Sequence, residues 1–176
     1  MNGNDQAALA AETANAKQWL KIAVVYRGKQ IEIWRNGKLY ADYQAPSQVT
    51  YPAESDLYFG LRCIMGQAHY GYLKGAINEA RIYNTALNRD IIARLTPEVR
   101  DNPKPLGCWS FNEGDTKDLM KNYPKAQLMG SASIKDNALI LDGKGYALIS
   151  QNIRVNHSPS KVQAGFYTPP HRPGLM

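Results

Sequence analysis

The chain has 176 residues, with 21 Lys and Arg against 15 Asp and Glu and a net charge of +6. Hydrophobic residues make up 44% and charged residues 20%, which is typical of a globular domain and excludes a disordered tail. No segment approaches the roughly 20 apolar residues of a transmembrane helix, so we expect no membrane span. The basic residues form neither a run nor a helical stripe, which argues against a nucleic-acid partner.

The N-terminal part of the sequence predicts three strands, the last two joined as a hairpin. Residues 18–26 form a short apolar run rich in β-branched side chains, which favours a strand. A second strand is expected around residues 31–33 and a third over residues 38–43. Asn36-Gly37 between them is a strong hairpin signal, because both central positions of a type I′ turn need a positive φ.

One helix is predicted, over residues 88–95. Asn88 is a suitable N-cap, Asp90 lies in the first turn, where the helix dipole favours a carboxylate, and Pro97 ends the helix. Its apolar face repeats at helical spacing, which indicates that the helix packs on the rest of the fold. This face consists of Leu87, Ile91, Ile92 and Leu95.

The remaining segments predict short strands with turn signals between them. Many short strands beside one short helix indicate an all-β fold, an antiparallel β-sandwich, and exclude a doubly wound parallel sheet. These further strands are expected over residues 57–64, 70–74, 76–83, 107–111, 126–130, 133–134, 138–141 and 146–149.

The composition divides the chain into three parts. Residues 1–17 are a polar, alanine-rich lead-in without the apolar core of a signal peptide. Residues 18–150 contain the predicted sandwich, interrupted by a proline-rich connector over residues 97–105. In residues 151–176 the strand alternation fades and several prolines favour an extended linker, which we interpret as truncated at its end.

The two cysteines, Cys63 and Cys108, match neither a zinc-binding spacing nor a C-x-x-C redox motif. Each falls in a predicted strand, which favours buried free thiols. Pairing as a disulfide in an oxidising compartment is the alternative.

Several segments resemble laminin G-like domains, which have a concanavalin A-like jelly-roll fold. Residues 19–26 read W-L-K-I-A-V-V-Y, residues 31–39 read I-E-I-W-R-N-G-K-L, and residues 72–95 contain G-A-I-N-E-A-R-I-Y-N-T-A-L, all similar to the closing part of that family. A departure is Asn78, where the family usually has Asp. Residues 108–114, C-W-S-F-N-E-G, resemble the family's opening strand.

The opening elements of the family thus follow the closing ones in this chain. The closing half covers residues 18–96 and the opening half residues 106–150, where L-D-G-K-G-Y-A-L-I is similar to an early hairpin of the family. A circularly permuted or interrupted single sandwich explains this order, and we favour it because sandwich termini often lie close together. The end of one module joined to the start of a second is the alternative.

The tail carries a second resemblance. Residues 163–176, Q-A-G-F-Y-T-P-P-H-R-P-G-L-M, resemble the entry to the catalytic domain of β-fructosidases, such as invertases and levanases. The nucleophilic Asp of that family would lie beyond residue 176, so no catalytic residue is assigned. The resemblance implies an adjacent glycoside hydrolase domain as a partner.

Together these resemblances imply a non-catalytic accessory module that binds a polysaccharide or oligosaccharide. The family further implies a secreted, periplasmic or cell-surface location. A scaffold that only packs against the catalytic domain, a protein-interaction module and an enzyme in its own right are the alternatives. Glycoside hydrolysis needs two carboxyl groups facing one sugar, and the sequence contains no E-x-D-x-E pattern. Glu79 is interpreted as a structural ion-pair partner.

Candidate sugar-binding residues are aromatic side chains near turns, since a flat ring can stack on a sugar face. Packing within the sheets explains each of them as well. They are Tyr40, Tyr43, His69, Tyr70 and Tyr72.

Calcium is the expected ion, because laminin G-like domains often bind it and short loops rich in Asp and Asn supply its oxygen ligands. We favour the interpretation that these residues are turn formers that cap their own backbone, with calcium binding as the alternative. The candidates are Asn112, Glu113, Asp115, Asp118 and Asp142.

Overall fold

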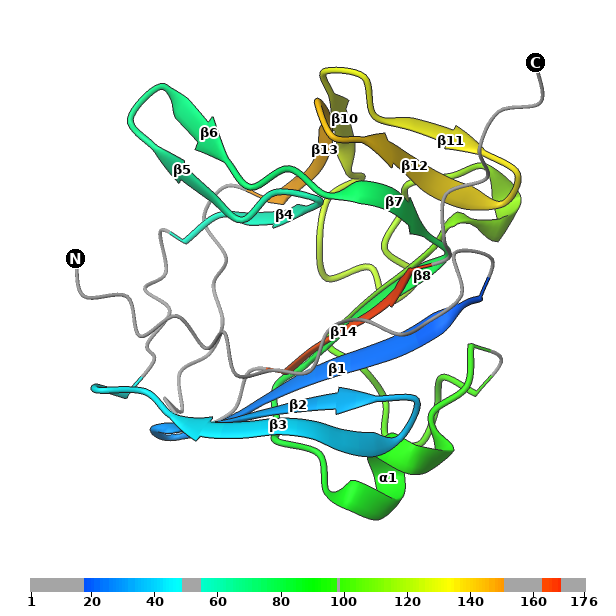
Figure 1. The fold of residues 1–176 in the computed structure, drawn as a ribbon. Coiled ribbons are helices and arrows are strands. Elements are labelled where there is room, and N and C mark those ends of the chain that lie inside the picture. The colour runs from blue at the N-terminus through cyan, green and yellow to red at the C-terminus, as the bar shows by residue number, and fades with distance from the viewer. Residues whose placement is uncertain (1–17, 49–54, 98, 151–162, 169–176) are drawn as a thin grey trace.

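Two layers of antiparallel strands form the molecule, and the computed structural model describes residues 18–48, 55–97, 99–150 and 163–168 of it (Figure 1). The larger layer is one six-stranded sheet. Its strands lie in the order β3 (Lys38–Gln44), β2 (Gln30–Arg35), β1 (Leu20–Arg27), β14 (Gln163–Thr168), β8 (Glu79–Tyr83) and β9 (Gly107–Ser110).

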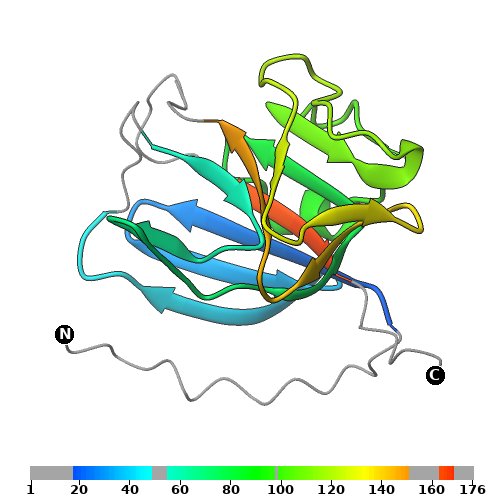
Figure 2. The same ribbon diagram turned by 90° about the horizontal axis from the view of Figure 1, so that it is seen from above.

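Two three-stranded sheets make the facing layer, and a two-stranded ribbon extends from it (Figures 1 and 2). One sheet has the order β10 (Gln127–Met129), β13 (Tyr146–Ser150) and β4 (Leu57–Phe59). The other has the order β11 (Ser133–Lys135), β12 (Ala138–Asp142) and β7 (Lys74–Ile77). The ribbon consists of β5 (Cys63–Met65) and β6 (Ala68–Tyr70).

The predicted β-sandwich is therefore confirmed, and its two sequence halves are hydrogen-bonded to each other. β8 of the first half pairs with β9 of the second, β7 pairs with β12, and β4 pairs with β13. Each of the three larger sheets contains strands from before and after the connector, so the two halves share one sandwich.

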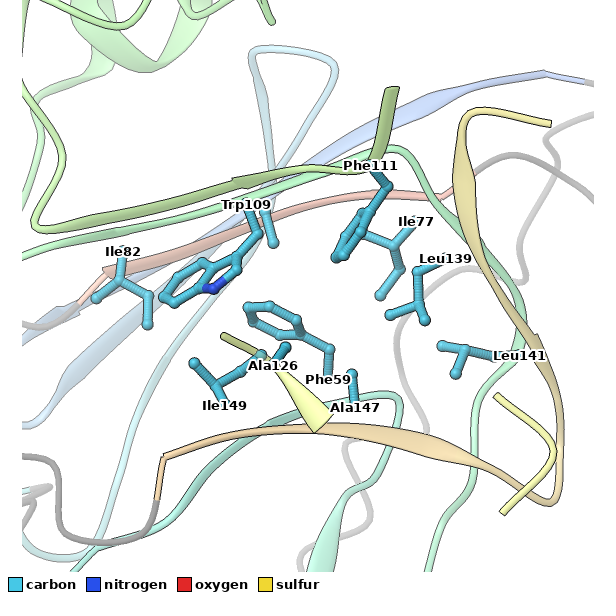
Figure 3. Close-up of a cluster of buried hydrophobic side chains, with 11 residues drawn as sticks. Phe59, Ile77, Ile82, Trp109, Phe111, Ala126, Leu139, Leu141, Ala147 and Ile149 are labelled. Atoms are coloured by element: carbon cyan, nitrogen blue, oxygen red, sulfur yellow. The ribbon is translucent and has the colours of Figure 1, made fainter. Parts of the chain in front are cut away.

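The space between the layers is filled by a hydrophobic core (Figure 3). Trp109 of β9 is fully buried, and its ring meets that of Phe59 edge to face, with centroids 5.2 Å apart. Such aromatic pairs add about 0.5–1.5 kcal/mol beyond the burial of their area. The rest of the core consists of Ile77, Ala80, Ile82, Phe111, Ala126, Leu139, Leu141, Ala147 and Ile149.

A second hydrophobic cluster lies on the outer face of the six-stranded sheet, under helix α1 (Arg89–Arg94). The helix begins as predicted, because the Asn88 side chain accepts a hydrogen bond from the backbone N–H of Ile91 at 3.0 Å. Ile92 is fully buried on this face. The other buried members are Ala23, Val25, Trp34, Tyr83 and Leu87.

The Asn36-Gly37 turn between β2 and β3 is also confirmed. Both residues have a positive φ, 50° and 78°, as a type I′ turn demands. A Cβ added to Gly37 would lie 3.0 Å from the Cα of Ala93, so the turn packs tightly against α1.

Three of the strands predicted as continuous are broken in the structure. The segment 70–74 contains only the end of β6 and the start of β7, and residues 71–73 between them belong to no strand. The segment 57–64 divides into β4 and β5 at Gly60, whose φ is +87° and where a Cβ would lie 2.6 Å from Leu141. The segment 76–83 divides at Asn78, where the chain bends out of the facing layer and enters the six-stranded sheet as β8.

The predicted linker over residues 151–176 needs a correction. Residues 163–168 form β14, which pairs with β1 on one side and with β8 on the other. The prolines that suggested an extended linker flank this strand and are not in it, and the six residues are too few for alternation to be recognised. Residues 151–162 and 169–176 lie outside the described part of the chain.

Both cysteines are free thiols. Cys108 of β9 is fully buried, as expected, whereas Cys63 at the start of β5 is half-buried. Burial, reinforced by the charge of Glu79, raises the pKa of the Cys108 thiol to about 11.

The outer face of β8 contains a fully buried carboxylate, Glu79, which the sequence indicated as an ion-pair partner. Its Oε1 accepts from Nε of Arg81 at 2.6 Å, and its Oε2 accepts from Nη2 of Arg100 at 2.7 Å. Arg81 is itself buried and donates to three backbone carbonyls at the start of the connector and just before it. These are the carbonyls of Thr96, Pro97 and Val99, at 2.6–2.9 Å.

We predict that Glu79→Ala lowers the free energy of unfolding by about 3–5 kcal/mol, because it leaves Arg81 charged and buried without a carboxylate. Arg100 is partly exposed, so Arg100→Ala is the milder comparison and is expected to lower stability by about 1 kcal/mol. Urea unfolding of the three proteins measures both. A loss below about 1 kcal/mol for Glu79→Ala would show that the pair does not hold the connector.

The buried thiol gives a second prediction. At pH 8, Ellman's reagent should modify Cys63 and leave Cys108 intact, whereas both thiols should react in urea. Because the pKa of Cys108 is about 11 in the folded protein and near 9 when unfolded, stability should fall as pH rises from 9 to 11, where the unfolded thiol ionises first. Rapid modification of two thiols in the folded protein would contradict this.

Candidate functional site

A cleft of about 540 Å³ lies beside the start of β1 and is lined by residues from several turns of both layers. Its lining is dominated by amide side chains beside one large aromatic ring. The lining residues are Trp19, Leu20, Lys21, Asn36, Asn78, Pro97, Asn112, Asp136 and Asn137.

Asn78 ties three of these segments together. It lies at the bend between β7 and β8, and its Nδ2 donates both to Oδ1 of Asn112 and to the carbonyl of Asn137, the latter at 2.9 Å. The backbone carbonyl of Asn78 accepts from the N–H of Phe111 at 3.0 Å. The bend, the 3-10 helix η1 (Phe111–Glu113) and the β11–β12 turn are thereby held as one wall of the cleft.

Asp136 and Asn137 form the turn between β11 and β12, and both have a positive φ, 51° and 61°. Asp and Asn tolerate this conformation better than other residues with a side chain. Both side chains are exposed beside the cleft.

The opposite wall is fixed by Asn36 and Lys21. Oδ1 of Asn36 accepts from the backbone N–H of Lys21 at 2.9 Å, and the N–H of Asn36 donates to the carbonyl of Lys21 at 2.8 Å. The Lys21 ammonium donates to the carbonyls of Ala93 and Leu95 at the end of α1, at 2.9 and 2.8 Å. Burial lowers the pKa of Lys21 below its usual value.

Trp19 adds an exposed ring to this polar lining, since 46% of its surface is accessible. An exposed indole offers a flat apolar face on which a sugar ring can stack. The combination of one aromatic face with several amides provides hydrogen-bond donors and acceptors around a flat apolar surface, which suits a ligand rich in hydroxyl groups.

The aromatic residues singled out in the sequence lie elsewhere. His69, Tyr72 and Tyr146 form a cluster near the ribbon: Nδ1 of His69 lies 3.1 Å from the Tyr72 hydroxyl, and the His69 and Tyr146 rings meet edge to face at 5.4 Å. Tyr70 is 47% exposed on β6. None of these residues lines the cleft.

Tyr40 and Tyr43 lie on β3, at one edge of the six-stranded sheet, and both are half-buried. Tyr40 contacts the guanidinium of Arg35, whose carbon lies 6.0 Å from the ring centre. The structure therefore separates the five sugar-binding candidates into two groups.

The calcium candidates are engaged with different partners. Asp115 forms ion pairs with Lys117 and Lys125 at 2.6 and 3.0 Å, and these two hydrogen bonds lower the pKa of its carboxyl. Asp142 accepts from the backbone N–H of Lys144 at 2.9 Å and from the Ser131 hydroxyl, and these bonds lower its pKa as well.

Asp118 is buried, and four backbone N–H groups saturate its carboxylate. Oδ1 accepts from Cys108 and Met120, and Oδ2 from Asn122 and Tyr123, at 2.8–3.1 Å. Asn112 lies in the cleft instead. Within the described ranges no three His, Cys, Asp or Glu residues gather as metal ligands, and calcium binding stays a prediction.

The sequence did not reveal the cleft. Trp19, Asn78 and Asn112 were noted within the family resemblance, and Asn112 was also a calcium candidate. Asn36, Asp136 and Asn137 belong to hairpin turns, and a turn signal says nothing about which other turns lie beside it. The departure from Asp at position 78 was the one available sign, since Asn can donate the two hydrogen bonds that Asp cannot.

We predict that Asp118→Asn lowers the free energy of unfolding by about 2–4 kcal/mol, because an amide NH2 would face backbone N–H groups that need an acceptor. Asp142→Asn at the exposed turn should change it by less than about 1 kcal/mol. Urea unfolding with and without millimolar calcium tests both variants. A calcium-dependent stability that Asp118→Asn abolishes would instead identify this loop as a metal site.

Comparison with known proteins agrees with this architecture. A laminin G-type family model, described as the concanavalin A-like lectin/glucanases superfamily, matches residues 1–93, more than half of the chain. No curated protein and no solved structure matches, and the comparisons give no support for the β-fructosidase resemblance of the tail. In the part of the chain that the structure describes, no helix is long and apolar enough to cross a membrane. The match over residues 1–93 and the sandwich of antiparallel sheets place this chain in the concanavalin A-like lectin/glucanases superfamily.

Proposed function

We propose that this protein is a non-catalytic carbohydrate-binding module whose binding site is the cleft beside Trp19. The observation that carries the proposal is the lining itself, an exposed indole surrounded by four asparagine side chains. Amides donate and accept at once, which is what sugar hydroxyls require, and an aromatic face matches the apolar face of a sugar ring. The superfamily contains lectins, which is consistent with this use of the fold.

A role beside a glycoside hydrolase domain outside the cell is the finer part of the proposal. It rests on the locations typical of the laminin G-like family and on the β-fructosidase-like sequence of residues 163–176, a resemblance that the comparisons do not support. The β14 strand takes up part of that segment, so the cleft and not the tail is the stronger support for carbohydrate binding.

A protein-interaction module is the second candidate, because the β5–β6 ribbon exposes two large apolar side chains. Met65 is 54% and Tyr70 is 47% accessible. Exposed apolar groups on a projecting ribbon suit contact with another protein surface.

The first experiment is a glycan array probed with the full chain, followed by calorimetric titration of the best ligand with and without calcium. Trp19→Ala should weaken binding about tenfold, the loss expected for a stacking contact of roughly 1.5 kcal/mol. Tyr70→Ala is the matched control, because Tyr70 has almost the same exposure and lies outside the cleft.

Each outcome distinguishes the candidates. Loss of binding in Tyr70→Ala with none in Trp19→Ala would move the site to the aromatic cluster near the ribbon. If no glycan binds to a chain that circular dichroism shows to be folded, the carbohydrate proposal fails and the interaction module takes its place.

A further inference from the structure

The cleft has few ionisable side chains, and they differ in whether they are free to contact a ligand. Lys21 and Asp136 are the ionisable residues among those lining it. The Lys21 ammonium already donates to two carbonyls at the end of α1, where a cation is favoured by the helix dipole. The Asp136 carboxylate is exposed. An anionic ligand would therefore meet a negative charge and a cation committed elsewhere.

Three lysines, Lys117, Lys121 and Lys125, lie instead at a separate hollow of about 350 Å³, where Lys117 and Lys125 pair with Asp115. The positive net charge of the chain therefore does not indicate that the cleft binds an acidic ligand. The charge of the lining favours an uncharged ligand over an acidic one.

The hydrogen bond between Asn78 and Asn112 determines which of their amide atoms remain available to a ligand. Asn78 uses its Nδ2 as donor to Oδ1 of Asn112 and to the carbonyl of Asn137. An amide NH2 has two hydrogens, so Oδ1 is the atom of Asn78 left to accept from a ligand. Because Oδ1 of Asn112 is accepting, its Nδ2 is the group left to donate.

One acceptor and one donor group are therefore held side by side in the lining of the cleft. Two adjacent hydroxyls of a sugar ring fit this pattern, since one can donate to Asn78 while the other accepts from Asn112. A carboxylate or sulfate group placed at this pair only accepts and would leave Oδ1 of Asn78 without a donor, so an acidic sugar can meet the pair only through its hydroxyls.

We infer that the cleft selects an uncharged glycan residue and that Asn78 and Asn112 recognise two of its adjacent hydroxyls. This inference rests on the proposed carbohydrate function and names the class of glycan. It assigns a specificity role to Asn112, which the sequence suggested only as a calcium ligand.

Asn112→Asp tests the donor role while keeping the wall intact. The carboxylate can still accept from Nδ2 of Asn78, but it has lost the NH2 that would donate to the ligand. Asn84→Asp introduces the same charge at an exposed position outside the cleft and is the matched control. Circular dichroism and the melting temperature check that both variants fold.

The full chain and both variants are assayed on arrays of neutral, uronic-acid and sulfated oligosaccharides at low and high salt. We expect neutral glycans to bind, with an affinity that changes less than about twofold with salt because no ligand charge is screened. Asn112→Asp should weaken this binding about tenfold, the value of one hydrogen bond at the upper end of its range, and Asn84→Asp should not.

The experiment distinguishes failure of this inference from failure of the carbohydrate proposal. Preferential binding of acidic glycans that weakens as salt rises would overturn the inference and leave the carbohydrate proposal standing. Equal affinities of Asn112→Asp and Asn84→Asp for a neutral glycan would overturn the hydroxyl recognition by Asn112. Binding of no glycan at all would overturn both.

Discussion

The carboxylate of Glu79 is buried where water cannot solvate it. The arrangement of the neighbouring segments follows from the ion pairs that compensate this charge. β8 is buried on both faces, so its outward residues need partners as much as its inward ones. Arg81 neutralises Glu79 and, with its remaining donors, binds the carbonyls of Thr96, Pro97 and Val99 after α1. The path of the chain from the helix to β9 is therefore set by a buried ion pair, and Pro97 takes its place in the cleft as a result.

The cleft is a composite of short segments that belong to different elements. The Asn36 turn, the Asn78 bend, η1 and the β11–β12 turn contribute one or two residues each. Their positions depend on the pairing of β7 with β12 and of β8 with β9, which join the two halves of the sequence. A site built in this way is as rigid as the sandwich that presents it, which lowers the entropy lost when a ligand binds.

Most of the fold could be predicted from short-range signals in the sequence. Asn36-Gly37 and Asn88 specify their turn and helix start through their own backbone and side chains, so they could be recognised without the rest of the chain. The break at Gly60 could not, because the close approach of Leu141 comes from a strand about eighty residues later. The cleft is hidden for the same reason: Asn112 and Asn78 become neighbours only through tertiary pairing.

The position of β14 has a consequence for biosynthesis. This strand lies between β1 and β8, yet it is made after every other strand of the six-stranded sheet. While the ribosome is still short of residue 168, β1 and β8 each present an open edge with unpaired backbone groups. Open edges are templates for pairing with other chains, so the nascent protein passes through an aggregation-prone stage that ends when β14 pairs with β1 and β8.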